Sequence, residues 1–151
     1  MKKIIVTGGS GFIGANLVNF LIEKNFFVIN LDKLTYSSSS YGNKHRSKKN
    51  YKLIKVDINN RDKIIKIIKK YRPKAIFNLA AETHVDRSID GPRNFIYTNV
   101  NGTFELLECL RYLNKSKISP RLIHISTDEV FGDVKKGRTK ESHRYEPSSP
   151  Y

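Results

Sequence analysis

Two adjacent carboxyl groups are the first residues in this sequence that could carry out acid–base chemistry. Asp128 and Glu129 follow Thr127 in the segment S-T-D-E-V-F-G-D, directly after an apolar run over residues 122–126. Two carboxyl groups in one crevice cannot both ionise freely, so one of them tends to keep its proton. An acid and a base would then stand side by side. An Asp-Glu pair by itself is more often a solvated turn, so its position in the fold has to decide.

A glycine-rich segment near the N-terminus predicts a site for phosphate groups. T-G-G-S-G-F-I-G, residues 7–14, stands between an apolar β-branched run and a segment with helical spacing. Gly8 would allow a sharp turn, Gly11 a close approach of the backbone to a pyrophosphate, and Gly14 close packing of helix on strand. The helix would offer its first N–H groups and the positive end of its dipole to the phosphates. The alternative is a glycine-rich turn without a ligand.

Acidic residues at the ends of the next two apolar runs are consistent with this phosphate site. Asp32 ends one run, where a carboxylate accepts hydrogen bonds from the ribose hydroxyls of NAD and repels the 2′-phosphate of NADP. The neighbouring Lys33 leaves NADP open, since a cation could tolerate that phosphate. Asp57 and Ile58 follow the other run at the level expected for adenine, although a turn without a ligand explains them equally well. The pattern therefore predicts NAD as the cofactor.

Metal binding and cysteine chemistry are not favoured. His84, Asp86 and Arg87 follow the fourth apolar run, but their spacing brings no two ligands together on a regular element, and ion pairs with Arg87 are the better explanation. We therefore expect no metal site. The single cysteine, Cys109, lies among leucines and is expected to be a buried thiol outside any disulfide. His124, within the fifth apolar run, is expected to be a core or packing histidine.

The elements that must position these groups alternate between strand and helix. Apolar runs with strand character cover residues 2–7, 27–32, 51–57, 75–80 and 122–126. Helical spacing covers residues 12–23, 60–71 and about 90–113. Residues 35–50 are predicted to form a loop. This alternation predicts one α/β domain with a doubly wound, Rossmann-like parallel sheet, whose ligands bind beyond the carboxyl ends of the strands.

Composition and charge exclude several classes of protein. The 151 residues include 28 Lys and Arg against 14 Asp and Glu, which gives a net charge of +14. These cations are spread along the whole chain, so a solvated basic surface is favoured over a nucleic-acid footprint. No apolar stretch approaches the length of about 18 residues that a membrane span needs. The single cysteine and an N-terminus that begins with a strand rather than a signal peptide predict a cytoplasmic location.

Six segments together resemble the extended short-chain dehydrogenase/reductase family and, within it, the dTDP-glucose 4,6-dehydratases. They are T-G-G-S-G-F-I-G, L-D-K-L-T-Y, N-L-A-A-E-T-H-V-D-R-S-I, T-N-V-N-G-T, H-I-S-T-D-E-V-F-G-D and P-S-S-P-Y. The most specific piece is Thr127-Asp128-Glu129, because related epimerases lack the two carboxyl groups. The resemblance implies an NAD-dependent lyase that dehydrates dTDP-glucose to a 4-keto-6-deoxy sugar, for deoxysugar synthesis such as that of rhamnose.

The resemblance also implies roles for individual residues. A tyrosinate, matched here to Tyr151, would remove the proton of the sugar 4-hydroxyl while NAD takes the hydride. Glu129 would abstract the proton at position 5, Asp128 would protonate the leaving 6-hydroxyl, and Thr127 would hydrogen-bond the sugar near its 4-hydroxyl. The residues implied to line the cofactor are Gly8, Gly11, Phe12, Ile13, Gly14, Asp32, Lys33, Leu34, Thr35, Asp57, Ile58, Leu79, Ala80, Ala81, Glu82, Thr83 and Thr98.

The family's Tyr-x-x-x-Lys motif would place its lysine beyond Tyr151. We therefore expect residues 1–151 to be an NAD-binding domain that stops before its last strands, without a substrate domain and inactive alone. The resemblance implies a homodimer in the complete protein, with no nucleic-acid or membrane partner. Two alternatives stay open. One is another nucleotide-sugar enzyme, such as a UDP-sugar 4,6-dehydratase or epimerase, and the other is a non-catalytic dinucleotide-binding or nucleic-acid-binding module.

Overall fold

Five parallel strands form one sheet in the order β3-β2-β1-β4-β5, in a computed structural model that describes residues 1–38, 49–134 and 136–151. The strands are β1 (Lys3–Thr7), β2 (Phe27–Asp32), β3 (Tyr51–Lys55), β4 (Ala75–Asn78) and β5 (Arg121–His124). The chain builds outward from β1 to β3 and then returns to the other side of β1. The predicted doubly wound parallel sheet is confirmed, and its switch point lies between β1 and β4. Part of the loop predicted over residues 35–50 lies outside the described residues.

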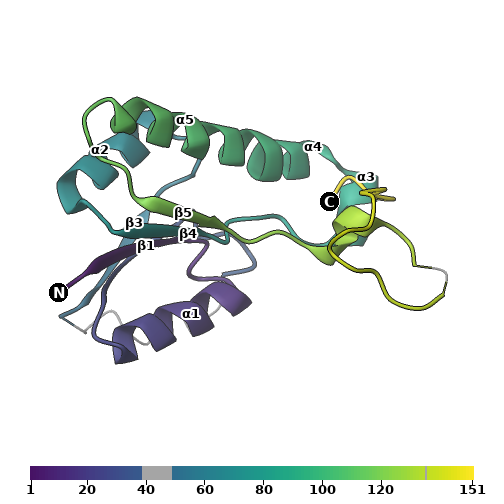
Figure 1. Ribbon diagram of the computed structural model, residues 1–151, viewed down its shortest axis with the longest axis horizontal. Helices are drawn as coiled ribbons and strands as arrows, with labels where there is room; N and C mark the ends of the chain where they lie inside the picture. The colour runs from purple at the N-terminus through teal and green to yellow at the C-terminus, as the bar shows by residue number, and fades with distance from the viewer. Residues whose placement is uncertain (39–48, 135) are drawn as a thin grey trace.

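Helices cover both faces of this sheet (Figure 1). Helix α1 (Phe12–Glu23) lies on one face, and α2 (Arg61–Tyr71) and α5 (Gly102–Asn114) lie on the other. Short elements lie towards the carboxyl ends of the strands. They are α3 (Val85–Asp90), α4 (Arg93–Phe95), the π-helix η2 (Ile96–Asn101) and the 3-10 helix η3 (Asp128–Phe131).

The ends of α2 illustrate how local sequence sets these bounds. The Asn60 side chain accepts a hydrogen bond from the Lys63 N–H and so caps the first turn. At the other end Arg72 takes a left-handed conformation, with φ +45°, and its N–H bonds to the carbonyl of Ile68. Pro73 follows and cannot continue the helix.

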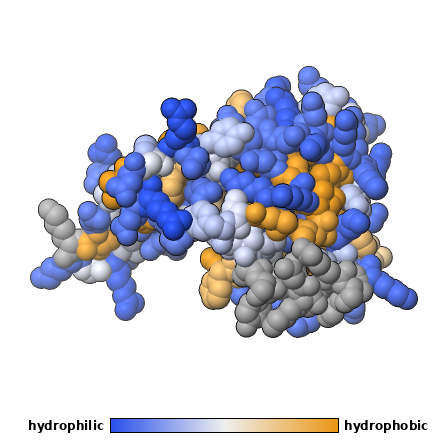
Figure 2. Space-filling view, turned by 180° about the vertical axis from the view of Figure 1, so that it is seen from behind, coloured by the Kyte–Doolittle hydropathy of each residue, from blue (hydrophilic) through white to orange (hydrophobic). Residues whose placement is uncertain are grey.

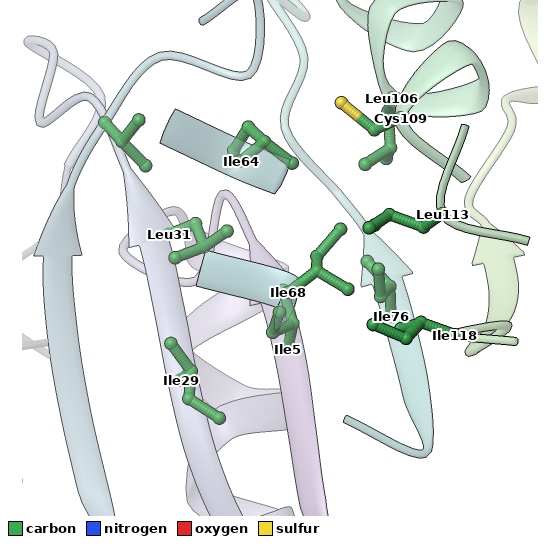
Figure 3. Packing of buried hydrophobic residues seen from close by; sticks show 11 residues of the cluster. Ile5, Ile29, Leu31, Ile64, Ile68, Ile76, Leu106, Cys109, Leu113 and Ile118 are labelled. Atoms are coloured by element: carbon green, nitrogen blue, oxygen red, sulfur yellow. The ribbon is translucent and has the colours of Figure 1, made fainter. Parts of the chain in front are cut away.

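The core consists of two hydrophobic layers, one on each side of the sheet. Alternate residues of β1 point to opposite faces, so Ile5 belongs to the layer under α2 and α5, and Val6 to the layer under α1. Figure 3 shows the first layer, in which side chains from strands and from both helices meet around Ile68. Cys109 is fully buried there, as predicted, and burial raises the pKa of its thiol to about 11.

Ion pairs join α2 to α5 above this layer. Arg61 lies 3.2 Å from Glu108 and 3.8 Å from Glu105, and Arg111 lies 2.6 Å from Glu108. The hydrogen bond from Arg111, followed by its charge and by Arg61, lowers the pKa of Glu108 to about 2. This cluster ties the two helices that cover one face of the sheet.

The long helix predicted to open at Asp90-Gly91-Pro92 and to run to about residue 113 is confirmed as a continuous helical stretch from Arg93 to Asn114, made of α4, η2 and α5. Gly91 and Pro92 separate it from the short helix α3, because proline has no N–H to continue the hydrogen-bond ladder. A π-helix then carries the chain into α5. His124, expected as a core or packing residue, is exposed on the edge strand β5 and so is not in the core, but its Nδ1 forms a hydrogen bond with the Asn78 side chain at 3.0 Å.

Hydrophilic residues cover most of the face seen in Figure 2, and hydrophobic residues gather in one area of it. Within the described part of the chain, no helix combines the length and hydrophobicity of a membrane span.

Candidate functional site

The glycine turn joins β1 to α1 and leaves its backbone open. Gly8 has φ +66°, and a Cβ there would lie 2.8 Å from the backbone of Ala80. A Cβ on Gly14 would overlap the carbonyl oxygen of Gly8 and lie 2.8 Å from Gly9 Cα. Gly11 is the N-cap residue of α1 and has no side chain to cap it. The first N–H groups of α1 therefore remain free to bind an anion.

Asp32, at the end of β2, binds this turn directly. Its carboxylate is buried and accepts hydrogen bonds from the N–H of Ser10 at 2.9 Å and of Leu34 at 2.8 Å. Oδ1 also accepts from the Ser38 hydroxyl at 3.4 Å, whereas Oδ2 binds the Ser10 N–H and has a second lone pair that can accept a bond from a ligand hydroxyl. Asp32 therefore fixes the turn and keeps capacity for a ribose.

A cleft of about 500 Å³ opens beyond the carboxyl ends of the strands. All residues predicted to line a cofactor do line this cleft, with the exception of Leu34, whose N–H instead bonds Asp32. The sequence analysis missed several further lining residues. They are Leu31, Ser37, Ser38, Val56, His84, Ile125 and Ser126. Most of them directly precede or follow a predicted residue at a strand end, and that adjacency was the available signal.

The loop after β3 is anchored to η2. Asp57 Oδ1 accepts hydrogen bonds from the backbone N–H and the side-chain amide of Asn59, at 2.9 and 3.0 Å. The Asn59 amide also donates to the carbonyl of Tyr97 at 3.2 Å, and Asn101 donates to Asn59 Oδ1 at 2.6 Å. These bonds fix the wall of the cleft that carries Asp57 and Ile58.

The loop after β4 is held from two sides. The Ala80 N–H donates to Thr7 Oγ1 at 3.2 Å, at the end of the neighbouring strand. The side chain of Asn99, on η2, accepts from the Glu82 N–H and donates to the Glu82 carbonyl, both at 2.9 Å. The backbone that faces the cleft is therefore fixed before any ligand arrives.

Lys33 and Glu82 meet across the cleft. The Lys33 ammonium lies 3.6 Å from Glu82 Oε1 and donates a hydrogen bond to Thr98 Oγ1 at 3.2 Å. The Tyr36 hydroxyl donates to Glu82 Oε2 at 3.3 Å, and the Arg87 guanidinium lies over the Tyr36 ring at 4.5 Å. The carboxylate ion pair in this region is therefore formed with Lys33, whereas the sequence analysis expected Arg87.

The four residues matched to catalytic roles do not all reach the cleft. Tyr151 lines it, and its ring packs edge-on against Phe95 with centroids 6.5 Å apart. Thr127 is the N-cap of η3 and Asp128 and Glu129 are its first two residues; the three directly follow the lining residue Ser126 but lie outside the lining themselves. Thr127 Oγ1 accepts from the Glu129 N–H at 3.2 Å and caps η3. Asp128 is exposed and Glu129 is half-buried, and their roles stay predictions.

His84 stacks against the Tyr36 ring with centroids 6.1 Å apart. In the ranges that the structure describes, no three His, Cys, Asp or Glu side chains come together as metal ligands would.

Curated proteins with related sequences are dTDP-glucose 4,6-dehydratases. The chain is 44% identical to a probable dTDP-glucose 4,6-dehydratase of Sinorhizobium fredii, over 99% of the chain and 45% of that protein. It is also 44% identical to the dTDP-glucose 4,6-dehydratase of Haemophilus influenzae, over the whole chain and 47% of that protein. The chain therefore spans about half the length of the curated relatives it matches.

The chain is also similar to solved structures of a dTDP-glucose 4,6-dehydratase and of a UDP-glucose 4-epimerase. The dTDP-glucose 4,6-dehydratase DesIV of Streptomyces venezuelae, solved with NAD bound, superposes with a TM-score of 0.89 at 36% identity, over 99% of the chain and 47% of DesIV. The UDP-glucose 4-epimerase of Thermotoga maritima superposes with a TM-score of 0.83 at 31% identity, over 99% of the chain and 46% of that enzyme.

A family model also matches the chain. The model described as GDP-mannose 4,6 dehydratase aligns with residues 5–151, from β1 through the glycine turn and η3 to Tyr151. Because this match includes nearly every residue, the chain belongs to the GDP-mannose 4,6 dehydratase family.

Proposed function

We propose that residues 1–151 form the NAD-binding domain of an enzyme that dehydrates dTDP-glucose to dTDP-4-keto-6-deoxyglucose. The observation that carries this proposal is the single cleft in which the glycine turn, the buried Asp32 and Tyr151 all take part. The similarity to the dTDP-glucose 4,6-dehydratases of Sinorhizobium fredii and Haemophilus influenzae supports the choice of substrate.

The residues of the cleft fit NAD. Gly8 and Gly14 have no side chains, which would otherwise fill the turn. The backbone N–H groups at the start of α1 can therefore approach a pyrophosphate. Asp32 would accept from the ribose hydroxyls, and the fixed Asp57–Ile58 wall would bind the adenine. When bound, NAD supplies a hydride acceptor and donor, so that the sugar can be oxidised at position 4 and reduced at position 6 without net redox change.

The chain's own residues would move the protons. Tyr151, as a tyrosinate, would take the proton of the 4-hydroxyl, and Thr127 would hold that hydroxyl in place. Glu129 would take the proton from position 5 after the 4-keto group has acidified it. Asp128 would give a proton to the 6-hydroxyl, which leaves as water. These assignments rest on the position of the four residues in matching motifs and on the nearness of η3 to the cleft.

The finer properties of the complete protein belong to the same proposal. We infer a homodimer that works in the cytoplasm and has no nucleic-acid or membrane partner. A UDP-sugar enzyme is the second candidate, and the likeness to the Thermotoga maritima UDP-glucose 4-epimerase favours it. Turnover of dTDP-glucose compared with UDP-glucose decides between the two.

Rapid-scan absorbance of the reaction tests the assignment of the two carboxyl groups. In the complete enzyme, Glu129→Gln should still form NADH from NAD+ and dTDP-glucose but should stall before water is lost. Asp128→Asn should likewise slow elimination more than oxidation, each by about 10²–10⁴-fold, the usual contribution of a general acid or base. Glu141→Gln, an exposed carboxylate outside the lining of the cleft, is the control and should change neither step. Equal loss of oxidation and elimination in both variants would contradict the separate roles.

A further inference from the structure

The choice between NAD and NADP is open at the level of the sequence, because Lys33 follows Asp32 directly. A carboxylate at the ribose repels a 2′-phosphate, whereas a cation near the same place accommodates it. Both residues line the cleft. Cofactor preference therefore depends on where the Lys33 ammonium is held.

The structure pairs this ammonium with side chains of two other segments of the chain. Lys33 starts at the end of β2, but its Nζ lies 3.6 Å from Glu82 Oε1 in the loop after β4, and it donates to Thr98 Oγ1 on η2 at 3.2 Å. Thr98 is buried, and the side chain of Glu82 is only 13% exposed. The Lys33 ammonium therefore interacts with a carboxylate and a hydroxyl in a partly desolvated environment, where charge interactions are stronger than in water.

Glu82 is itself fixed, so it can act as an anchor. Its backbone N–H and carbonyl both bond the side chain of Asn99, and its second carboxylate oxygen accepts from the Tyr36 hydroxyl. The other nearby cation, Arg87, lies over the Tyr36 ring. The anchor therefore keeps Lys33 paired while Asp32 stays the charged group nearest the turn.

We infer that Glu82 is a specificity-determining residue that enforces NAD over NADP by holding the Lys33 ammonium away from the ribose. This inference rests on the proposed NAD-binding function of the cleft. Once Glu82 loses its charge, Lys33 is free to turn towards the end of β2 and to meet a 2′-phosphate there. The preference for NAD is then a property of the Asp32–Lys33–Glu82 triplet as well as of Asp32.

Affinities for NAD and NADP, measured by calorimetry on the protein and its variants, test this inference. In Glu82→Gln the ratio of NADP to NAD affinity should rise about fivefold, the size of one partly exposed charge pair. Adding Lys33→Met to Glu82→Gln should abolish most of that rise, because the gain depends on the lysine. Glu141→Gln removes the same charge from an exposed position and should leave the ratio unchanged.

Lys33→Met alone gives an independent answer if Glu82→Gln fails to fold. Lys33→Met can change the affinity for both cofactors, since Lys33 lines the cleft, but the ratio of NADP to NAD affinity should not rise, because no free ammonium is left to meet the 2′-phosphate. A rise of that ratio in Lys33→Met, or an unchanged ratio in a folded Glu82→Gln, would overturn the inference while leaving NAD binding intact. Failure of the unchanged protein to bind NAD at all would instead overturn the proposed function, and this inference with it.

Discussion

Asp32 combines two tasks at the residue scale. Its carboxylate accepts from Ser10 and Leu34 and so holds the turn that would bind the pyrophosphate, and it also faces the expected ribose. A substitution there should therefore affect the binding site and the stability of the loop together. The sequence predicted the ribose contact from the strand-end position, but the bonds to the turn depend on backbone positions that only the fold brings together.

Asp32→Ala should weaken NAD binding by about ten- to hundredfold, which corresponds to one charge-assisted hydrogen bond. It should also lower the melting temperature, because two N–H groups lose a buried acceptor. Calorimetric titration and thermal unfolding measure the two effects. Asp32→Asn keeps one acceptor oxygen and should fall between the two proteins. NADP binding as tight as NAD binding in the unchanged protein would refute the ribose assignment.

Gly14→Ala should damage the turn more than any effect on helix propensity would suggest. The added Cβ would overlap the Gly8 carbonyl and press on Gly9, so the backbone has to shift. Overpacking of this kind costs about 1–3 kcal/mol. The control is Gly91→Ala, whose Cβ would meet only the Arg87 carbonyl, at 3.8 Å. Chemical denaturation should show a clear loss for Gly14→Ala and little for the control, and equal losses would contradict the steric argument.

At the scale of elements, η2 connects the loops that form the cleft. Thr98 binds Lys33 after β2, Asn99 binds Glu82 after β4, and Asn101 binds Asn59 after β3. π-Helical turns frequently occur at functional sites, because the extra residue re-aims neighbouring side chains. The helical spacing of the sequence predicted a helix here but gave no sign of the wider turn. Its partners lie far away along the chain, so no local pattern could reveal them.

The bond between Asn59 and Asn101 should be measurable as a coupling. Single alanine variants at either position should weaken NAD binding, and the double variant should cost less than the sum by about 0.5–1.5 kcal/mol, the net value of one hydrogen bond. Asn16→Ala, which removes an exposed bond to the Phe12 carbonyl within α1, provides a comparison for the loss of an asparagine elsewhere. Strict additivity at Asn59 and Asn101 would show that the loop does not depend on this bond.

The ion pairs between α2 and α5 predict a dependence of stability on pH. Arg111 and Arg61 lower the pKa of Glu108 to about 2 in the folded protein, from an ordinary value of 4.5. A carboxyl with a lowered folded pKa stabilises the fold above its unfolded pKa, and this contribution disappears as the pH falls towards 2. The difference in melting temperature between the protein and Glu108→Gln should therefore shrink between pH 5 and about pH 2. A difference that stays constant over that range would contradict the lowered pKa.

At the scale of the whole molecule, the arrangement of layers followed from the order of strand and helix patterns. Five apolar runs separated by helices leave few topologies for a parallel sheet, and the observed order is one of them. The strand ends were placed too late, at residues 57, 80 and 126, because those apolar residues leave the sheet and line the cleft instead. Val56, Leu79 and Ile125 show this most clearly, because each was predicted within a strand but lies beyond its end and lines the cleft. Hydrophobicity alone cannot distinguish an apolar residue that is buried in the sheet from one that lines a ligand-binding cleft.

The net charge of +14 belongs to the same scale and separates the remaining alternatives. A protein that binds nucleic acid through many lysines loses about 10³–10⁵ in affinity between 50 and 200 mM salt. The cleft proposed for NAD would bind the pyrophosphate through backbone N–H groups, and the charge of its lysine, Lys33, is already paired with Glu82. We therefore expect NAD affinity to change by no more than about threefold over that range. Calorimetry for NAD and a gel-shift assay with duplex DNA, run at both salt concentrations, compare the two. A DNA complex that persists at the higher salt, together with no NAD binding at either salt concentration, would favour the nucleic-acid-binding alternative over the enzyme.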